Sequence, residues 1–214
     1  MTQTGRNVRH IISVILNILI VVFTGIGTYI MLHQSGSGAE LTSAGAENLK
    51  YFTVLSNEFC GITAAAWLVL TAFRKKTPLL AKLMAASAVG LTFLIIAAFL
   101  APMYPDLDLY ADANLWFHLI VPVTGMAEFL ILEPDRKIPF GYAVISALPA
   151  LLYGTGYLTN ILINGKGEWP DTNDWYGFLN WGYPAGIGIF AAIVLMDFGM
   201  AALLRGLNGL LNKK

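Results

Sequence analysis

The sequence is short of charge and of cysteine. Of its 214 residues only 12% are Asp, Glu, Lys or Arg, about half of the roughly 25% found in soluble domains. So few charges exclude a disordered chain and argue against a water-soluble domain, whose surface needs more polar groups. The 13 Lys and Arg residues balance 13 Asp and Glu residues, so no basic surface indicates nucleic-acid binding. The single cysteine, Cys60, excludes an internal disulfide and a multi-cysteine metal site, and we expect neither a metal nor a cofactor.

Apolar and aromatic residues make up 57% of the chain and gather into six long runs. A bilayer core about 30 Å thick requires a helix of about 20 mostly apolar residues. We therefore predict an all-α polytopic membrane protein, with residues 1–214 forming one domain of six transmembrane helices. The predicted spans are residues 11–32, 51–73, 79–103, 113–132, 140–163 and 178–204.

The basic residues are distributed unequally between the two sides of these spans. Apart from Lys50 and Lys166, every Lys and Arg lies before the first span, in or beside the second and fourth loops, or after the last span. Lys82 is counted with the second loop, and most of the acids occupy the opposite loops. The positive-inside rule therefore predicts that both termini are cytoplasmic and that the protein is multi-pass in the plasma (inner) membrane.

Three acids, Glu58, Glu128 and Asp197, and one histidine, His118, lie inside the predicted spans. A charge at mid-depth costs about 2.5–3.5 kcal/mol on the insertion scale, so such residues mark functional sites or hydrogen-bond neighbouring helices. Thr53 and His118 fall at similar depths in the outer half, whereas Glu128 lies roughly 15 Å along the helix from His118 at 1.5 Å per residue. Thr53 and His118 are therefore the pair of interest.

Prolines are expected to interrupt three spans. Each proline removes the hydrogen bond to the carbonyl four residues earlier. Pro122 leaves the carbonyl of His118 open, Pro149 leaves that of Ile145 open, and Pro184 leaves that of Asn180 open. Kinks of this kind open space and leave acceptors that need partners.

A hydroxyl and an imidazole at the same depth can form a catalytic dyad. The threonine hydroxyl is a weak nucleophile that becomes useful when a general base takes its proton, and neutral histidine has suitable basicity. Attack on an ester would give an acyl-enzyme, whose oxyanion needs donors. Threonine in a helix also commonly bonds its own backbone. Candidates for substrate binding or oxyanion support are Ser56, Asn57, Glu58, Tyr153, Tyr157, Asn160 and Trp181.

Three short segments carry a family resemblance: residues 48–57 (NLKYFTVLSN), 116–122 (WFHLIVP) and 174–178 (DWYGF). Together they resemble bacterial relatives of the androgen-induced protein / androgen-dependent TFPI-regulating protein family. The resemblance implies a multi-span threonine hydrolase that cleaves fatty acid esters of hydroxy fatty acids. It also implies catalytic roles for Thr53 and His118, which match the family's essential threonine and histidine.

Other functions remain open from the sequence. The buried acids Glu58, Glu128 and Asp197 are also compatible with a small transporter or channel, and a non-catalytic lipid-binding protein is a third reading. Acyl transfer by Cys60 is a further option. Cys60 lies deeper than Thr53, however, where a thiol is less reactive, and a buried apolar role suits it better.

Overall fold

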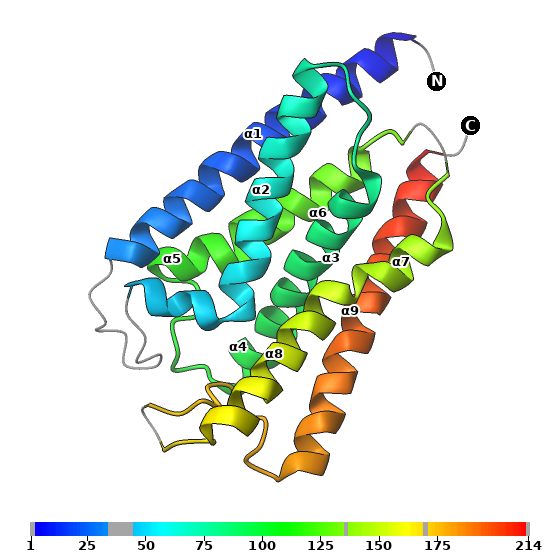
Figure 1. Ribbon diagram of the computed structural model, residues 1–214. Helices are drawn as coiled ribbons and strands as arrows, with labels where there is room; N and C mark the ends of the chain where they lie inside the picture. The colour runs from blue at the N-terminus through cyan, green and yellow to red at the C-terminus, as the bar shows by residue number, and fades with distance from the viewer. Residues whose placement is uncertain (1–2, 34–44, 135–136, 169–170, 213–214) are drawn as a thin grey trace.

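The protein is described, as a computed structural model, over residues 3–33, 45–134, 137–168 and 171–212, and within these residues every regular element is helical (Figure 1). The α-helices are α1 (Gln3–His33), α2 (Phe52–Ala72), α3 (Leu79–Ile95), α4 (Ala101–Met103), α5 (Asp112–Leu115), α6 (Val121–Ile131), α7 (Phe140–Ser146), α8 (Leu148–Asn164) and α9 (Tyr183–Leu211). A 3₁₀-helix, η1 (Gly45–Lys50), precedes α2, and the π-helices η2 (Ile96–Leu100) and η3 (Trp116–Ile120) join α3 to α4 and α5 to α6.

Five helical stretches are long and apolar enough to cross a membrane. They are Asn7–His33, Phe52–Ala72, Leu79–Met103, Asp112–Ile131 and Tyr183–Leu211. The first four agree closely with predicted spans, because the π-helices continue α3 into α4 and α5 into α6 without a turn. These helices indicate a multi-pass membrane protein.

The last two predicted spans differ from the structure at prolines. The span over 140–163 is divided at Ala147 into α7 and α8, since Pro149 has no N–H to continue the helical bonding. The span over 178–204 begins later, because residues 178–182 form turns and α9 starts at Tyr183. The predicted interruption at Pro184 is wrong: this proline lies in the first turn of α9, where its missing N–H costs nothing.

Helix α1 has a polar buried stripe and an apolar exposed face. Ser13, Asn17 and Thr24 are 3%, 0% and 5% exposed, whereas Ile11 and Ile15 are 57% and 49% exposed. In water this arrangement would place the wrong side chains outside. Surrounded by lipid it is favourable, because acyl chains accept the isoleucines and the buried polar groups bond to one another.

The interior of the bundle contains a buried ion pair, close to the start of α3. Helix α3 packs against α2, α6, α7 and α9, and its Lys82 ammonium lies 2.6 Å from the Glu128 carboxylate of α6. The two side chains are 4% and 1% exposed. From its sequence position Lys82 is predicted to belong to the charges of the second loop. The structure instead buries it between helices, where it pairs with Glu128. Among the other basic residues used for the topology, Arg136, Lys213 and Lys214 lie outside the described residues.

Helices α8 and α9 approach closely at a glycine. A Cβ atom on Gly154 would lie 1.5 Å from the Phe190 ring, whereas a Cβ atom on Gly156 would meet nothing within 4 Å. Because Gly154 has no side chain, the Phe190 ring can pack against the backbone of α8 at this position. Gly156, two residues along the same helix, has no such neighbour.

We expect Gly154→Ala to destabilise the protein by about 1–3 kcal/mol, because the Phe190 ring must leave its position. Gly156→Ala is the matched control and is expected to be neutral or to stabilise by up to about 1 kcal/mol, as alanine is the better helix former. Thermal unfolding of the detergent-purified variants measures both. Equal effects of the two substitutions would contradict this packing.

Candidate functional site

Thr53 is the second residue of α2, and the start of this helix is fixed by a tyrosine. The backbone N–H of Phe52 donates to the Tyr176 hydroxyl at 2.9 Å, so a side chain from the loop before α9 caps the helix. Burial raises the pKa of Tyr176 well above its usual value, and the hydroxyl stays neutral. Thr53 itself is half-buried. Thr53 lies in the first turn of α2, and the start of α2 is at the same end of the bundle as the connection between α8 and α9 (Figure 1).

His118 lies on the π-helix η3 and is 5% exposed. Its Nδ1 atom is 2.6 Å from the carbonyl oxygen of Leu109, in the loop before α5. A carbonyl only accepts, so Nδ1 carries the proton and donates this bond. The neutral ring therefore keeps its lone pair on Nε2, the nitrogen that can act as a base.

Asn57 joins the helical turn of Thr53 to the π-helix of His118. Its amide nitrogen donates to the Thr53 carbonyl at 2.7 Å and to the Phe117 carbonyl at 2.9 Å. In η3 the N–H of Val121 bonds the carbonyl of Trp116, five residues earlier. In the same register the partner of the Phe117 carbonyl would be Pro122, which has no N–H. The carbonyl that the proline leaves open is therefore one residue earlier than predicted, and Asn57 satisfies it.

Thr53 and His118 share an end of the bundle without bonding each other. One cluster of buried side chains contains Tyr51 and Val54 from the start of α2 together with Phe117 from η3. These residues flank Thr53 and His118 in sequence. No hydrogen bond joins the Thr53 hydroxyl to the His118 ring in the described part of the chain.

The remaining candidates on α2 have partners on other helices. The Ser56 hydroxyl lies 3.0 Å from the Thr53 carbonyl and 3.0 Å from the Thr92 hydroxyl of α3. The Glu58 carboxylate accepts a hydrogen bond from the Thr28 hydroxyl of α1. Both hydrogens of the Asn57 amide are used in its two bonds to carbonyls. These residues therefore hold α2 in place, and Asn57 has no N–H left for an oxyanion.

The candidates on α8 bond to η1 and to the loop before α9. Tyr153 donates to the Lys50 carbonyl at 2.6 Å, Tyr157 donates to the Asp174 carboxylate, and Asn160 donates to the Asn173 side chain at 3.1 Å. Asp174 is 3% exposed and also accepts from the backbone N–H of Leu179. Trp181 is 74% exposed, and we leave it out of the site.

Several residues that shape the site escaped sequence reasoning. The Leu109 carbonyl and the Tyr176 hydroxyl come from loops, and no periodic pattern marks them. Ser13 and Asn17, which bond Glu128 at 2.7 and 2.8 Å, carried a usable signal: they are polar residues inside the first apolar run.

Comparison with known proteins finds no matching family model, no matching curated protein and no matching solved structure.

Asn57→Ala is expected to destabilise the protein by about 1–3 kcal/mol, because the buried Phe117 carbonyl loses its donor. Pro122→Ala restores a backbone N–H at position 122 that reaches this carbonyl in the π-helical register. The double substitution should therefore cost less than the sum of the two single substitutions. A double-mutant cycle on thermal stability measures the coupling, and strictly additive effects would refute this account of η3.

Proposed function

We propose that the protein is an intramembrane hydrolase of lipid esters, with Thr53 as nucleophile and His118 as general base. The observation that carries the proposal is the bond from His118 Nδ1 to the Leu109 carbonyl. It leaves Nε2 as the basic nitrogen, on a π-helix tied through Asn57 to the turn that holds Thr53. π-Helical segments are frequent at functional sites because they re-aim a side chain without ending the helix.

The proposed reaction has two stages. In the first, His118 Nε2 takes the proton of the Thr53 hydroxyl as its oxygen attacks the ester carbonyl. The same proton then passes to the departing alcohol oxygen, and the acyl group remains on Thr53. In the second, His118 takes a proton from water, the hydroxide cleaves the acyl–threonine ester, and the proton returns to the threonine oxygen. The products are a fatty acid and an alcohol.

The start of α2 offers the donors that the oxyanion requires. Thr53 and Val54 are the second and third residues of the helix, and N–H groups in the first turn have no acceptor within a helix. The helix dipole adds positive potential at the same end. Backbone N–H groups aimed at developing negative charge are the usual basis of an oxyanion hole. These two groups therefore replace Asn57 as the proposed donors.

The resemblance of residues 48–57, 116–122 and 174–178 supports a substrate class: fatty acid esters of hydroxy fatty acids. A substrate of this kind is a membrane lipid, so lateral entry is proposed, with the acyl chain between helices and the ester near Thr53. Exposed apolar residues on α2, Leu55 in the same turn as Thr53 and Ile62 further along the helix, favour contact with acyl chains.

Thr53→Ala and His118→Ala are each expected to abolish ester hydrolysis, because one removes the nucleophile and the other its base. Thr63→Ala is the matched control: Thr63 lies on the same helix and is 5% exposed, ten residues from Thr53, and its loss should leave turnover unchanged. The measurement is release of fatty acid from a hydroxy fatty acid ester in detergent micelles.

Covalent labelling gives an independent test. A fluorophosphonate probe should label wild type on Thr53, and His118→Ala should label poorly while unfolding at the wild-type temperature. Full hydrolytic activity in folded Thr53→Ala or His118→Ala would sink the proposal.

The alternative of a transporter with buried acids receives less support. Glu128 is bound to Lys82, Ser13 and Asn17, and Glu58 is bound to Thr28. Two of the three buried acids are thus held by fixed partners between helices, which favours a structural role for them.

We further propose six crossings with both termini in the cytoplasm, counting α7 and α8 together as one crossing. The support is the sequence distribution of Lys and Arg and the polar turn between α2 and α3. In a Cys60→Ala background, Asp106→Cys should react with an impermeant maleimide on intact cells. Lys76→Cys should react only after lysis, since both positions are exposed but lie at opposite ends. The reverse pattern would invert the topology.

A further inference from the structure

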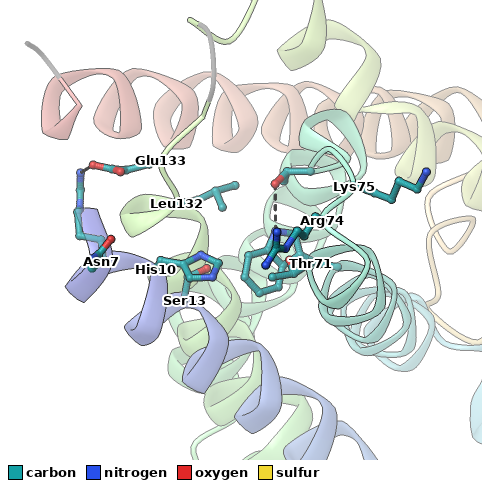
Figure 2. A pocket seen from close by; sticks show the side chains of 11 residues that line it. Asn7, His10, Ser13, Thr71, Arg74, Lys75, Leu132 and Glu133 are labelled. Carbon is teal, nitrogen blue, oxygen red and sulfur yellow. Dashed lines mark hydrogen bonds and ion pairs between the residues drawn. The ribbon is translucent and has the colours of Figure 1, made fainter. Parts of the chain in front are cut away.

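A pocket lies at the opposite end of the bundle from Thr53, and the proposed hydrolase does not use it. Figure 2 shows it between the first turns of α1 and the end of α2. Its volume is about 460 Å³, within the range of small-molecule sites. It is lined by Asn7, Arg9, His10, Ser13, Trp67, Thr71, Arg74, Lys75, Thr77, Leu132 and Glu133.

The charges around this pocket are mostly positive. Three of its residues are Arg or Lys, and Glu133 is its one acid. Glu133 lies 3.5 Å from Arg9, so the single negative charge has a partner. Among the described residues no carboxylate pairs with the Arg74 guanidinium. In Figure 2 the Arg74 side chain reaches toward the pocket, whereas Lys75 extends away from it.

Arg74 adopts a backbone conformation that favours glycine. Its φ is 54°, and its neighbours close α2 with the bonds of a Schellman turn, from the Lys75 N–H to the Leu70 carbonyl and from the Arg74 N–H to the Thr71 carbonyl. Arginine at this position costs backbone free energy that glycine would not.

Hydroxyl groups line the pocket together with Arg74, and a buried tryptophan is also among the lining residues. Thr71 and Thr77 line the same wall, and the Thr77 hydroxyl accepts from the Trp67 indole at 3.3 Å, which leaves its own proton for a ligand. Trp67 is 2% exposed and lies 5.5 Å under the Lys82 ammonium. Trp67 therefore connects the lining of the pocket to the buried ion pair of Lys82 and Glu128.

Exposed apolar side chains flank the same residues. Val8 and Ile11 on α1 are 50% and 57% exposed, and Val69 and Phe73 on α2 are 56% and 72% exposed. Each lies within a turn of a residue that lines the pocket. An anion that binds Arg74 and carries acyl chains would satisfy both the cation and these apolar surfaces.

We infer that this pocket binds the phosphate group of an anionic phospholipid, with Arg74 as its principal cation. Arginine's planar fork suits phosphate oxygens, and hydroxyl donors complete such a site. Basic pockets between membrane helices are a recurrent way to hold lipid head groups.

The test is a titration of detergent-purified protein with phosphatidylglycerol, read by native mass spectrometry and by the unfolding temperature. Phosphatidylcholine is the zwitterionic control. Phosphatidylglycerol should raise the wild-type unfolding temperature by roughly 5 °C at saturation. Arg74→Gln should bind it roughly fivefold more weakly, the loss expected for one cation near the membrane surface.

Two variants separate binding from folding. Lys76→Gln removes an exposed positive charge two residues away that does not line the pocket, and it should bind as wild type does. Arg74→Gly relieves the strained φ, so it should unfold at the wild-type temperature or above without lipid, yet bind phosphatidylglycerol at least about fivefold more weakly than wild type does.

Three results would overturn the inference. Equal weakening by Lys76→Gln and Arg74→Gln would show a diffuse surface charge effect instead of a site. Unchanged binding in Arg74→Gly would remove Arg74 from any site. Protection by soluble glycerol phosphate equal to that of phosphatidylglycerol would indicate a site for soluble phosphates instead of a lipid.

Discussion

The ion pair between Lys82 and Glu128 is the interaction on which the packing of the bundle depends. The idealised cost of moving one such ion from water to a medium of low dielectric constant is on the order of 20 kcal/mol, and attraction offsets it only when the remaining polar atoms are bonded. Here Glu128 also accepts from Ser13 and Asn17, and the side-chain amide oxygen of Asn17 accepts from Lys82 at 2.6 Å. The network therefore requires α1, α3 and α6 in one arrangement.

The consequences of this network extend along α1. Because Ser13 and Asn17 must face Glu128, isoleucines on the other side of the helix, such as Ile11, Ile15 and Ile18, face outward, and an apolar exposed surface follows. The helix then presents Thr24 and Gly27 to its neighbours in its C-terminal half. A Cβ on Gly27 would lie 2.8 Å from the Phe117 ring, so α1 meets η3 through a residue without a side chain. The buried ion pair and the environment of His118 are thus linked by the orientation of one helix.

Sequence patterns predicted the helices better than their interruptions. Apolar runs predicted the first four membrane-length helices to within a few residues, since length and hydropathy are local properties. The break at Ala147 and the late start of α9 depend on where each proline falls relative to a turn, and a run of apolar residues does not encode that. The burial of Lys82 was missed for a related reason: its partner, Glu128, lies 46 residues away in sequence, and only the packing of α3 on α6 joins them.

The candidate site shows the same division between local and distant information. The depth of Thr53 and of His118 follows from counting residues from the ends of their helices, and the structure keeps both at one end of the bundle. The tautomer of His118 does not follow from counting, because it is set by the carbonyl of Leu109 in a loop. The effect of Pro122 depends on both the local sequence and the packing of distant residues. A proline alone predicts an open carbonyl, but which carbonyl is open depends on the π-helical register, and that register is stabilised by Asn57 from another helix. The same side chain bonds the turn of Thr53, so the irregularity that positions the imidazole is held by the helix that carries the hydroxyl.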